Sequence, residues 1–181
     1  MRFTENIRTI TLKALDELER ADAEIKELES QRENYYKPRF DELMTEATSK
    51  RENIIASGRD SITKEISDFK ARIKERYTPK GEEITADANL LNCGIALNEN
   101  DIESLIDKYK NNNTMQRLLH EYASKNNLNI DRKYIGEAEK SKAADEMINY
   151  YNSVMQRPEY SDVWRDREQY QSSIGDELMG E

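Results

Sequence analysis

The chain has 181 residues, a length that fits one ordinary domain or a small domain with an extended appendage. Hydrophobic and charged residues each make up 36% of it, and glycine and proline are sparse at 6 and 3, which favours exposed helices over a compact mixed fold or a sheet. The net charge of −9 disfavours a general electrostatic grip on nucleic acid or on an anionic membrane surface.

The first predicted element is a long helix over residues 4–36, which contain no glycine or proline. Apolar side chains recur there in alternating steps of three and four, skipping Arg32, a narrow heptad-like seam that is typical of a helix packed on a partner helix. The residues of this predicted seam are Leu18, Ala21, Ile25, Leu28 and Tyr35. Pro38 interrupts the pattern, and the apolar stripe resumes one residue out of phase at Phe40 and Leu43. The second helical run then extends to Tyr77.

Two arrangements fit this pattern. The two arms, residues 4–36 and 39–77, are similar in length, which favours an antiparallel hairpin that turns near the sequence YYKP. The alternative is one kinked helix that pairs with another copy of the chain. We favour the hairpin and predict that residues 1–77 form a coiled-coil helical hairpin.

Residues 82–130 are predicted to form a small cluster of three short helices. In the first helix, Ile84, Ala88 and Leu91 share one face, and Gly94 follows as a C-terminal residue able to adopt the left-handed conformation. A cysteine, Cys93, precedes this glycine and has no histidine close to it in sequence, so we expect it to be structural or incidental and not a nucleophile.

The second and third helices of this cluster carry start signals. Asn98 with Asp101 three residues later forms a predicted capping box, and Leu97 with Ile102 forms a hydrophobic staple. Three asparagines at 111–113 then end that helix, and Thr114 is the predicted N-cap of the next. The buried face of the third helix is predicted to consist of Met115, Leu118, Leu119 and Tyr122.

Residues 136–157 are predicted to form a C-terminal helix that folds back along the hairpin. Its apolar residues, at steps of four, three and four, are Ala144, Ile148, Tyr151 and Met155. Residues 158–181 are predicted to be an acidic, partly disordered tail. Residues 1–80 carry 17 basic and 17 acidic groups, so the whole negative excess lies in residues 81–181.

No pattern in the sequence predicts an enzyme, a metal site or a cofactor. His120 is the only histidine, and Arg117 stands where a Glu-x-x-His ligand pair needs an acid. The residues 98–125 also offer an alternative, a helix-turn-helix-like module of a nucleic-acid-associated regulatory protein, with Gln116 and Arg117 early in the second helix. Residues 97–127 hold four basic and five acidic groups, which weakens this alternative.

The run from YTPKGEEIT to LLNCGIALNENDIESLIDKYKNNNTMQRLLHEYASKNNL resembles coiled-coil proteins of Gram-positive phages and prophages that are encoded near head-assembly genes. In that group a charged coiled-coil half precedes a leucine pair, a capped helix and an Asn-Thr-Met helix. The resemblance implies a scaffold-like assembly factor. Its matching positions are Leu90, Leu91, Asn98, Tyr109, Asn113, Thr114, Met115, Leu118 and Tyr122.

We therefore predict an all-α, non-enzymatic structural or interaction protein, a phage virion or assembly factor that acts through helix–helix contacts. The expected partners are a second copy of the chain, as a dimer or higher oligomer, and phage capsid or other virion proteins, with no membrane and no cofactor. The N-terminus lacks a signal-peptide core, so we expect a cytoplasmic or virion-associated protein. The predicted contact residues are Leu18, Ile25, Leu28, Ile62, Ile66, Phe69, Ile73, Tyr109, Met115, Leu118 and Tyr122.

Overall fold

The computed structural model describes residues 3–156, and each regular element in that range is helical, which confirms the all-α prediction. The chain divides into two compact units. Unit 1 contains the described residues 3–69 and 143–156, and unit 2 contains Lys70–Lys142. The predicted acidic tail at 158–181 lies outside the described residues.

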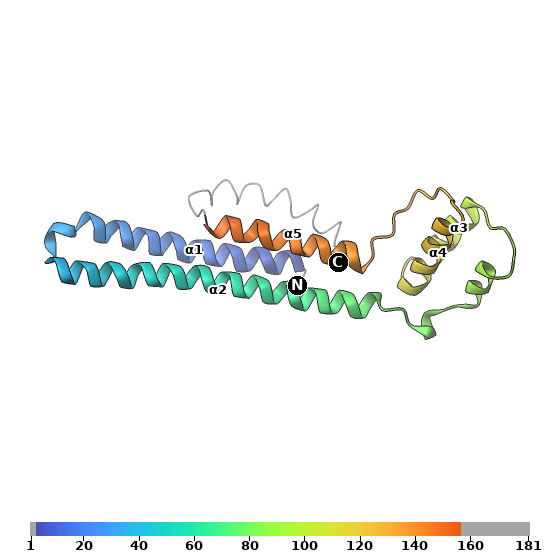
Figure 1. Cartoon of the computed structure of the whole chain (residues 1–181), viewed down its shortest axis with the longest axis horizontal. Coiled ribbons are helices and arrows are strands. Elements are labelled where there is room, and N and C mark those ends of the chain that lie inside the picture. Colours follow the sequence, from blue (N-terminus) through green and yellow to red (C-terminus); the bar gives the residue numbers. More distant parts are fainter. Residues whose placement is uncertain (1–2, 157–181) are drawn as a thin grey trace. The chain divides into compact units, whose positions relative to one another are not determined.

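Helices α1 (Phe3–Ser30) and α2 (Lys37–Tyr77) form the predicted antiparallel hairpin (Figure 1). Contacts between the two helices fix their directions, because residue numbers rise along α1 while those of the partners fall along α2. These contacts are Asn6 with Glu65 (Nδ2 to Oε1, 3.1 Å), Asp22 with Arg51 (Oδ1 to Nε, 2.5 Å) and Glu24 with Lys50 (Oε2 to Nζ, 2.6 Å). The single kinked helix is excluded.

The turn of the hairpin differs from the expectation in one respect. Helix α1 ends at Ser30, several residues before Tyr36, and the chain turns through the 3-10 helix η1 (Arg32–Asn34). Pro38 lies in the first turn of α2, where the N–H that proline lacks would have no intrahelical partner. Proline therefore helps to start α2 and does not kink a longer helix.

Helix α5 (Glu137–Gln156) packs beside the hairpin with its predicted apolar face inward (Figure 1). The side chains of Ala144, Tyr151 and Met155 are at most 3% exposed. Alongside it, α1 buries residues that the predicted seam did not include, because the same apolar spacing extends back to the start of the helix. The buried residues of α1 are Phe3, Thr4, Ile7, Thr11, Ala14, Leu15, Leu18 and Ala21.

Gly58 allows α5 to lie close to the hairpin. A Cβ built on Gly58 would stand 2.7 Å from Met155 Sδ and 3.2 Å from Ala14 Cβ, so a larger residue requires these neighbours to move. Met155 lies near the C-terminal end of the described part of α5, one residue before Gln156. We call residues 3–21 and 47–69 the covered section of the hairpin and residues 22–46 the distal section.

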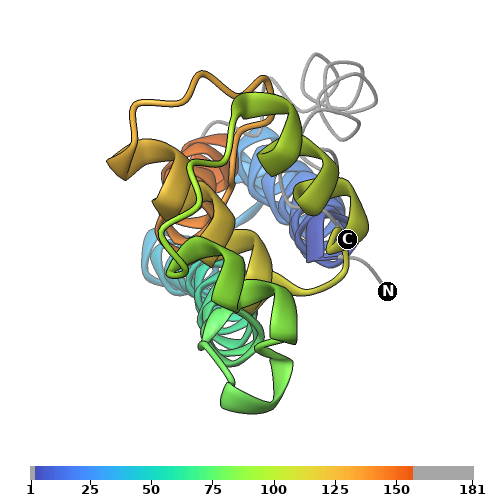
Figure 2. The same cartoon turned by 90° about the vertical axis from the view of Figure 1, so that its right-hand side faces the viewer.

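Unit 2 is built from short elements: η2 (Gly81–Glu83), η3 (Ala86–Leu91), α3 (Glu99–Lys108) and α4 (Asn113–Lys125) (Figure 2). The predicted first helix is wrong in type, because residues 81–91 form two 3-10 helices and Ile84 is 50% exposed. Helices α3 and α4 pack through Ile102, Ile106, Leu119 and Ala123. The half-buried residues around this core include Leu91, Leu97, Leu105, Tyr109, Tyr122, Leu128 and Ile130.

Candidate interaction surfaces

The structure places the predicted contact residues in two classes. More than half of them are buried inside a single chain, at most 3% exposed: Leu18, Ile62, Ile66, Phe69, Ile73 and Met115. The others are half-buried: Ile25, Leu28, Tyr109, Leu118 and Tyr122. Only the second class is partly accessible. Ile25 and Leu28 lie in the distal section, and Leu118 and Tyr122 line one groove of unit 2. Tyr109 lies elsewhere in unit 2, where its hydroxyl bonds to Asp87 and Thr85.

The distal section is an α1–α2 pair with an incompletely covered apolar seam. Residues 22–46 contain no fully buried residue, whereas the covered section buries a row along α1 and, on α2, Ala47, Gly58, Ile62, Ile66 and Phe69. At the turn Tyr36 is 70% exposed, and the Arg32 guanidinium lies 5.6 Å from the centre of the Phe40 ring. The half-buried apolar residues of this section are Ile25, Leu28, Tyr35, Phe40, Leu43 and Met44.

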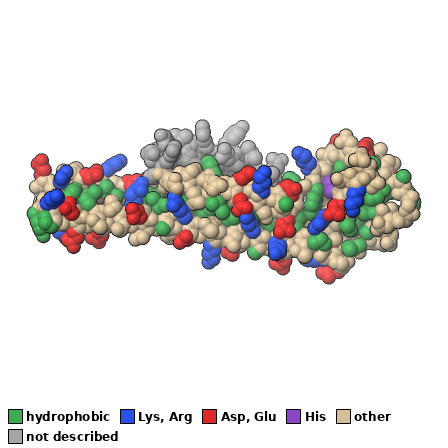
Figure 3. Space-filling view, in the orientation of Figure 1, with side chains coloured by type: hydrophobic (Ala, Val, Ile, Leu, Met, Phe, Trp, Pro, Cys, Tyr) green, Lys and Arg blue, Asp and Glu red, His purple; other side chains and the backbone are tan. Residues whose placement is uncertain are grey.

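Charge is distributed unevenly along the hairpin. The distal section carries eight acidic and four basic residues, whereas the covered section carries eight acidic and seven basic residues. Figure 3 shows hydrophobic side chains near the turn with charged groups on either side. The ion pairs of Asp22 with Arg51 and of Glu24 with Lys50 lie where the two sections meet. The distal section therefore presents an apolar strip with an acidic border.

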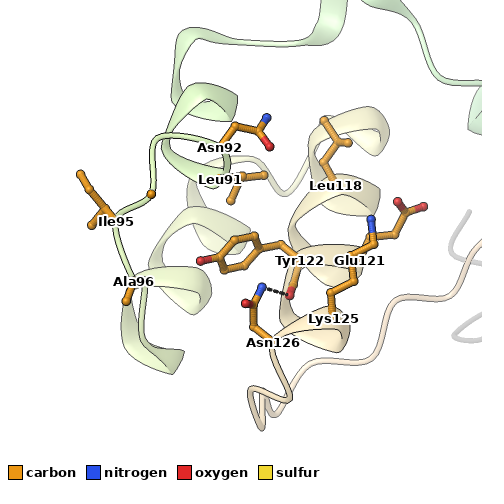
Figure 4. A pocket seen from close by; sticks show the side chains of 10 residues that line it. Leu91, Asn92, Ile95, Ala96, Leu118, Glu121, Tyr122, Lys125 and Asn126 are labelled. Atoms are coloured by element: carbon orange, nitrogen blue, oxygen red, sulfur yellow. Dashed lines mark hydrogen bonds between the residues drawn. The ribbon is translucent and has the colours of Figure 1, made fainter.

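The second surface is a groove of about 670 Å³ in unit 2, between residues 91–96 and α4. Leu118 and Tyr122, two predicted contact residues, line it from α4, and the Tyr122 ring points toward the opposite wall (Figure 4). Ile95 stands at the edge with 58% of its surface exposed, directly after Gly94, whose φ of +77° confirms the predicted left-handed conformation. Glu121 and Lys125 supply one charge of each sign.

The caps that position α3 and α4 differ in how well the sequence predicted them. The capping box of α3 is confirmed, with Asp101 N donating to Asn98 Oδ1 (3.1 Å) and Asn98 N donating to Asp101 Oδ2 (3.0 Å). The predicted N-cap Thr114 is wrong: Asn112 caps α4, accepting a hydrogen bond from Met115 N at 2.9 Å. The asparagine preceding the helix reaches this N–H, so Thr114 is free for another role.

That role is to hold the irregular segment before α3. The Thr114 hydroxyl donates to Glu83 Oε2 (2.6 Å) and accepts from Lys80 N (3.1 Å), while the Asn112 amide donates to the Glu83 carbonyl (2.7 Å). Asn113 adds a bond to the Arg76 carbonyl at 3.2 Å. The asparagine stretch is therefore a packing joint, in which side chains satisfy the backbone of a segment that has no long helix of its own.

A charged contact holds η3 to the end of α3. Lys108 Nζ and the Tyr109 hydroxyl both donate to Asp87 Oδ2, at 2.6 and 2.8 Å. The Thr85 hydroxyl donates to the Tyr109 hydroxyl oxygen at 2.9 Å. Hydrogen bonds from Lys108 and Tyr109 lower the pKa of Asp87, and the bond to Asp87 raises the pKa of Lys108, so both remain charged near neutral pH.

The side chains that a helix-turn-helix would offer to DNA are engaged within unit 2. Gln116 Nε2 donates to the Ile106 carbonyl at 2.6 Å, and Arg117 Nε pairs with Glu121 Oε1 at 2.8 Å. A recognition helix needs such groups free to reach base edges and phosphates. These contacts give no support to the nucleic-acid alternative.

His120 and Cys93 have ordinary structural surroundings. The His120 ring packs against Tyr134, with ring centres 5.5 Å apart, and burial lowers the pKa of His120, which keeps the imidazole neutral at pH 7. Cys93 is exposed, and its thiol donates to the Leu90 carbonyl at 3.2 Å. Among residues 3–156, no group of three His, Cys, Asp or Glu side chains is placed to hold a metal ion.

No helix within the described part of the chain is both long enough and apolar enough to cross a membrane. Comparison of the chain with models of protein families, with curated proteins and with solved structures gives no match.

Proposed function

We propose that the chain is a non-enzymatic structural protein that joins other proteins through helix–helix contacts, and that it acts in the assembly of a phage particle. The observation that carries the first part is the incompletely covered seam of the distal section. The sequence resemblance to phage proteins encoded near head-assembly genes supports the second part. The setting would be the host cytoplasm or the virion.

The distal seam favours binding because two helices alone cannot enclose the side chains between them. In the covered section α5 packs on the hairpin near Gly58, and residues there such as Ile7, Leu15 and Ile62 are fully buried. Apolar area removed from water contributes about 25 cal/mol per Å² to stability. A partner helix that covers the distal seam would therefore be held by the same kind of apolar burial that holds α5. An apolar seam that stays partly exposed along one section is typical of a surface that binds another protein.

The groove of unit 2 would add a second contact surface on the same chain. The groove is lined by Leu118, Tyr122 and Ile95. It differs from the acidic distal section in charge, because its two charged residues, Glu121 and Lys125, have opposite signs. A chain with two different contact surfaces suits an assembly factor, which must hold two components at once.

The proposal is tested in a lysogen whose prophage carries the gene for this chain. Deleting the gene should reduce the number of DNA-filled heads counted by electron microscopy after induction. A complementing copy with Leu28→Glu and Leu43→Glu should not restore them, because both changes place charge on the distal seam. A copy with Ala56→Glu and Ser67→Glu, at exposed positions of the covered section, should restore them. Normal heads after deletion would contradict a role in assembly.

A further inference from the structure

The distal section has the features of a binding site for one kind of helix. We propose that it binds an amphipathic helix with basic flanks that belongs to a different protein. This inference rests on the proposed function and names the chemistry of the partner. It follows from three observations on unit 1: the half-buried apolar seam, the groove beside it, and the charge along its border.

The shape favours a helix because the neighbouring section already holds one. Helix α5 buries Ala144, Tyr151 and Met155, and Met155 Sδ lies 2.7 Å from the place of a Cβ on Gly58. A shallow groove of about 550 Å³ begins at the next residue, Ser57, and is lined by Glu17, Glu46, Ser49, Lys50, Asn53, Ile54 and Ser57. This groove lies on the hairpin between the contact at Gly58 and the distal section.

The length of the open seam sets the size of the partner. From Glu17 at the groove to Ser30 at the end of α1, the hairpin rises about 20 Å at 1.5 Å per residue. A helix of about four turns covers this distance, and apolar residues at steps of three and four would face Ile25, Leu28 and Leu43. A short amphipathic segment is therefore sufficient.

The border of the seam favours a basic partner. Five exposed acidic residues of the distal section form no ion pair with a described residue: Glu27, Glu29, Glu33, Asp41 and Glu46. Among them only Glu27 accepts a side-chain hydrogen bond, from the amide of Gln31 at 3.1 Å. Lysine or arginine on the flanks of a docked helix would pair with these carboxylates, and the pairing would strengthen as water leaves the contact.

The same charges argue against a second copy of the chain as the occupant. Two distal sections facing each other would bring together two borders that each hold eight acidic and four basic residues. Like charges at close range oppose association, so the seam selects a partner of opposite charge. Self-association through this surface is accordingly an outcome that the experiment must detect.

The test uses the full chain and three fluorescein-labelled synthetic peptides of about 18 residues. The first is an amphipathic helix with leucine at heptad positions and lysine on both flanks. The second has glutamate in place of lysine, and the third is a scrambled form of the first. In fluorescence anisotropy we expect the first to bind at least about tenfold more tightly than the other two, with an affinity that falls as salt rises.

The site is located with two matched variants. Glu27→Lys, Glu29→Lys and Glu33→Lys together reverse three charges of the distal section and should weaken binding of the first peptide at least about tenfold. The control reverses three exposed charges of the covered section, Glu52→Lys, Asp60→Lys and Asp68→Lys, and should change binding less than about threefold. Circular dichroism verifies that both variants keep their helix content.

Three results would overturn the inference: equal binding of the first and the scrambled peptide, equal weakening by the two variants, or a dimer in analytical ultracentrifugation that Leu28→Glu with Leu43→Glu dissociates. The last result would identify a second copy as the occupant. Because the peptides do not depend on the phage, normal heads after gene deletion combined with selective peptide binding would remove the assembly role and leave the site. Fewer DNA-filled heads after gene deletion, together with no selective peptide binding, would support the assembly role and remove the proposed binding site.

Discussion

The covered and distal sections of the hairpin are made by the same two helices, yet they differ in the solvent exposure of their apolar residues. In the covered section Phe3, Leu15 and Phe69 are fully buried, whereas in the distal section Leu28 and Leu43 keep part of their surface in water. Helix α5 packs on the covered section near Gly58 and contributes to the burial there. The apolar seam of a hairpin therefore does not by itself specify what packs on it. A helix of the same chain packs on the covered section, while the distal section stays partly exposed.

The largest expected effect tests whether apolar side chains contribute more to stability in the covered section than in the distal section. Phe69 stacks on Phe3 with ring centres 4.1 Å apart, and both are 0% exposed. Phe69→Ala should lower the free energy of unfolding by about 3–5 kcal/mol, measured by urea denaturation. Phe40→Ala in the distal section should cost only about 1 kcal/mol. Equal losses would show that the two sections are equally well packed.

A smaller effect tests whether α5 causes the difference. Gly58→Leu places a side chain where Met155 Sδ and Ala14 Cβ lie, and should cost about 1–2 kcal/mol after the gain in helix propensity is included. Met155→Ala should then cost less in this background than in the wild type, with a coupling of about 0.5–3 kcal/mol in a double-mutant cycle.

The control for that cycle is Gly81→Leu, since a Cβ added at Gly81 meets nothing within 4 Å. This change should alter the free energy of unfolding by less than about 0.5 kcal/mol. Additive effects of Gly58→Leu and Met155→Ala would mean that α5 does not depend on the close approach at Gly58.

The smallest effect concerns the ion pair at the boundary between the sections. Arg51 and Asp22 are each 29% exposed at the side chain, so Arg51→Met should cost less than about 1 kcal/mol and the loss should shrink as salt is added. Lys50→Met breaks a more exposed pair, with side chains 59% and 48% exposed, and should have almost no effect. A loss that is unchanged in high salt would assign the role of Arg51 to packing of its aliphatic stem.

Local signals in the sequence predicted much of the fold. The phase slip at Pro38 located the hairpin turn, the Asn98 and Asp101 pair located the start of α3, and the apolar spacing of residues 137–156 located α5. Each of these signals acts over a few residues, so the chain that surrounds it does not alter its meaning. The buried residues between Phe3 and Leu15 carried the same helical spacing and were within reach of the same reasoning.

What the sequence did not predict depends on contacts between distant residues. Thr114 is a good N-cap by residue type, but a bond to Glu83, 31 positions away, occupies its hydroxyl while Asn112 serves as the cap. The spacing of Ile84 fits a helix face, yet residues 81–91 form short 3-10 turns, and Asn112 and Thr114 hold Glu83 by hydrogen bonds. The apolar character of the predicted contact residues followed from the sequence. Which of them would be buried within the chain, and which would stay partly accessible, did not.

The place of α5 in the chain has a consequence for how unit 1 forms during synthesis. The contact between Ala14 and Gly58 closes soon after both have emerged from the ribosome, but Met155 follows Ala14 by 141 positions and arrives only after all of unit 2 has been made. Until then the covered section is also an open seam. We expect the nascent hairpin to be at its most prone to aggregation in that interval, and folding to be completed when α5 closes the longest loop of the unit.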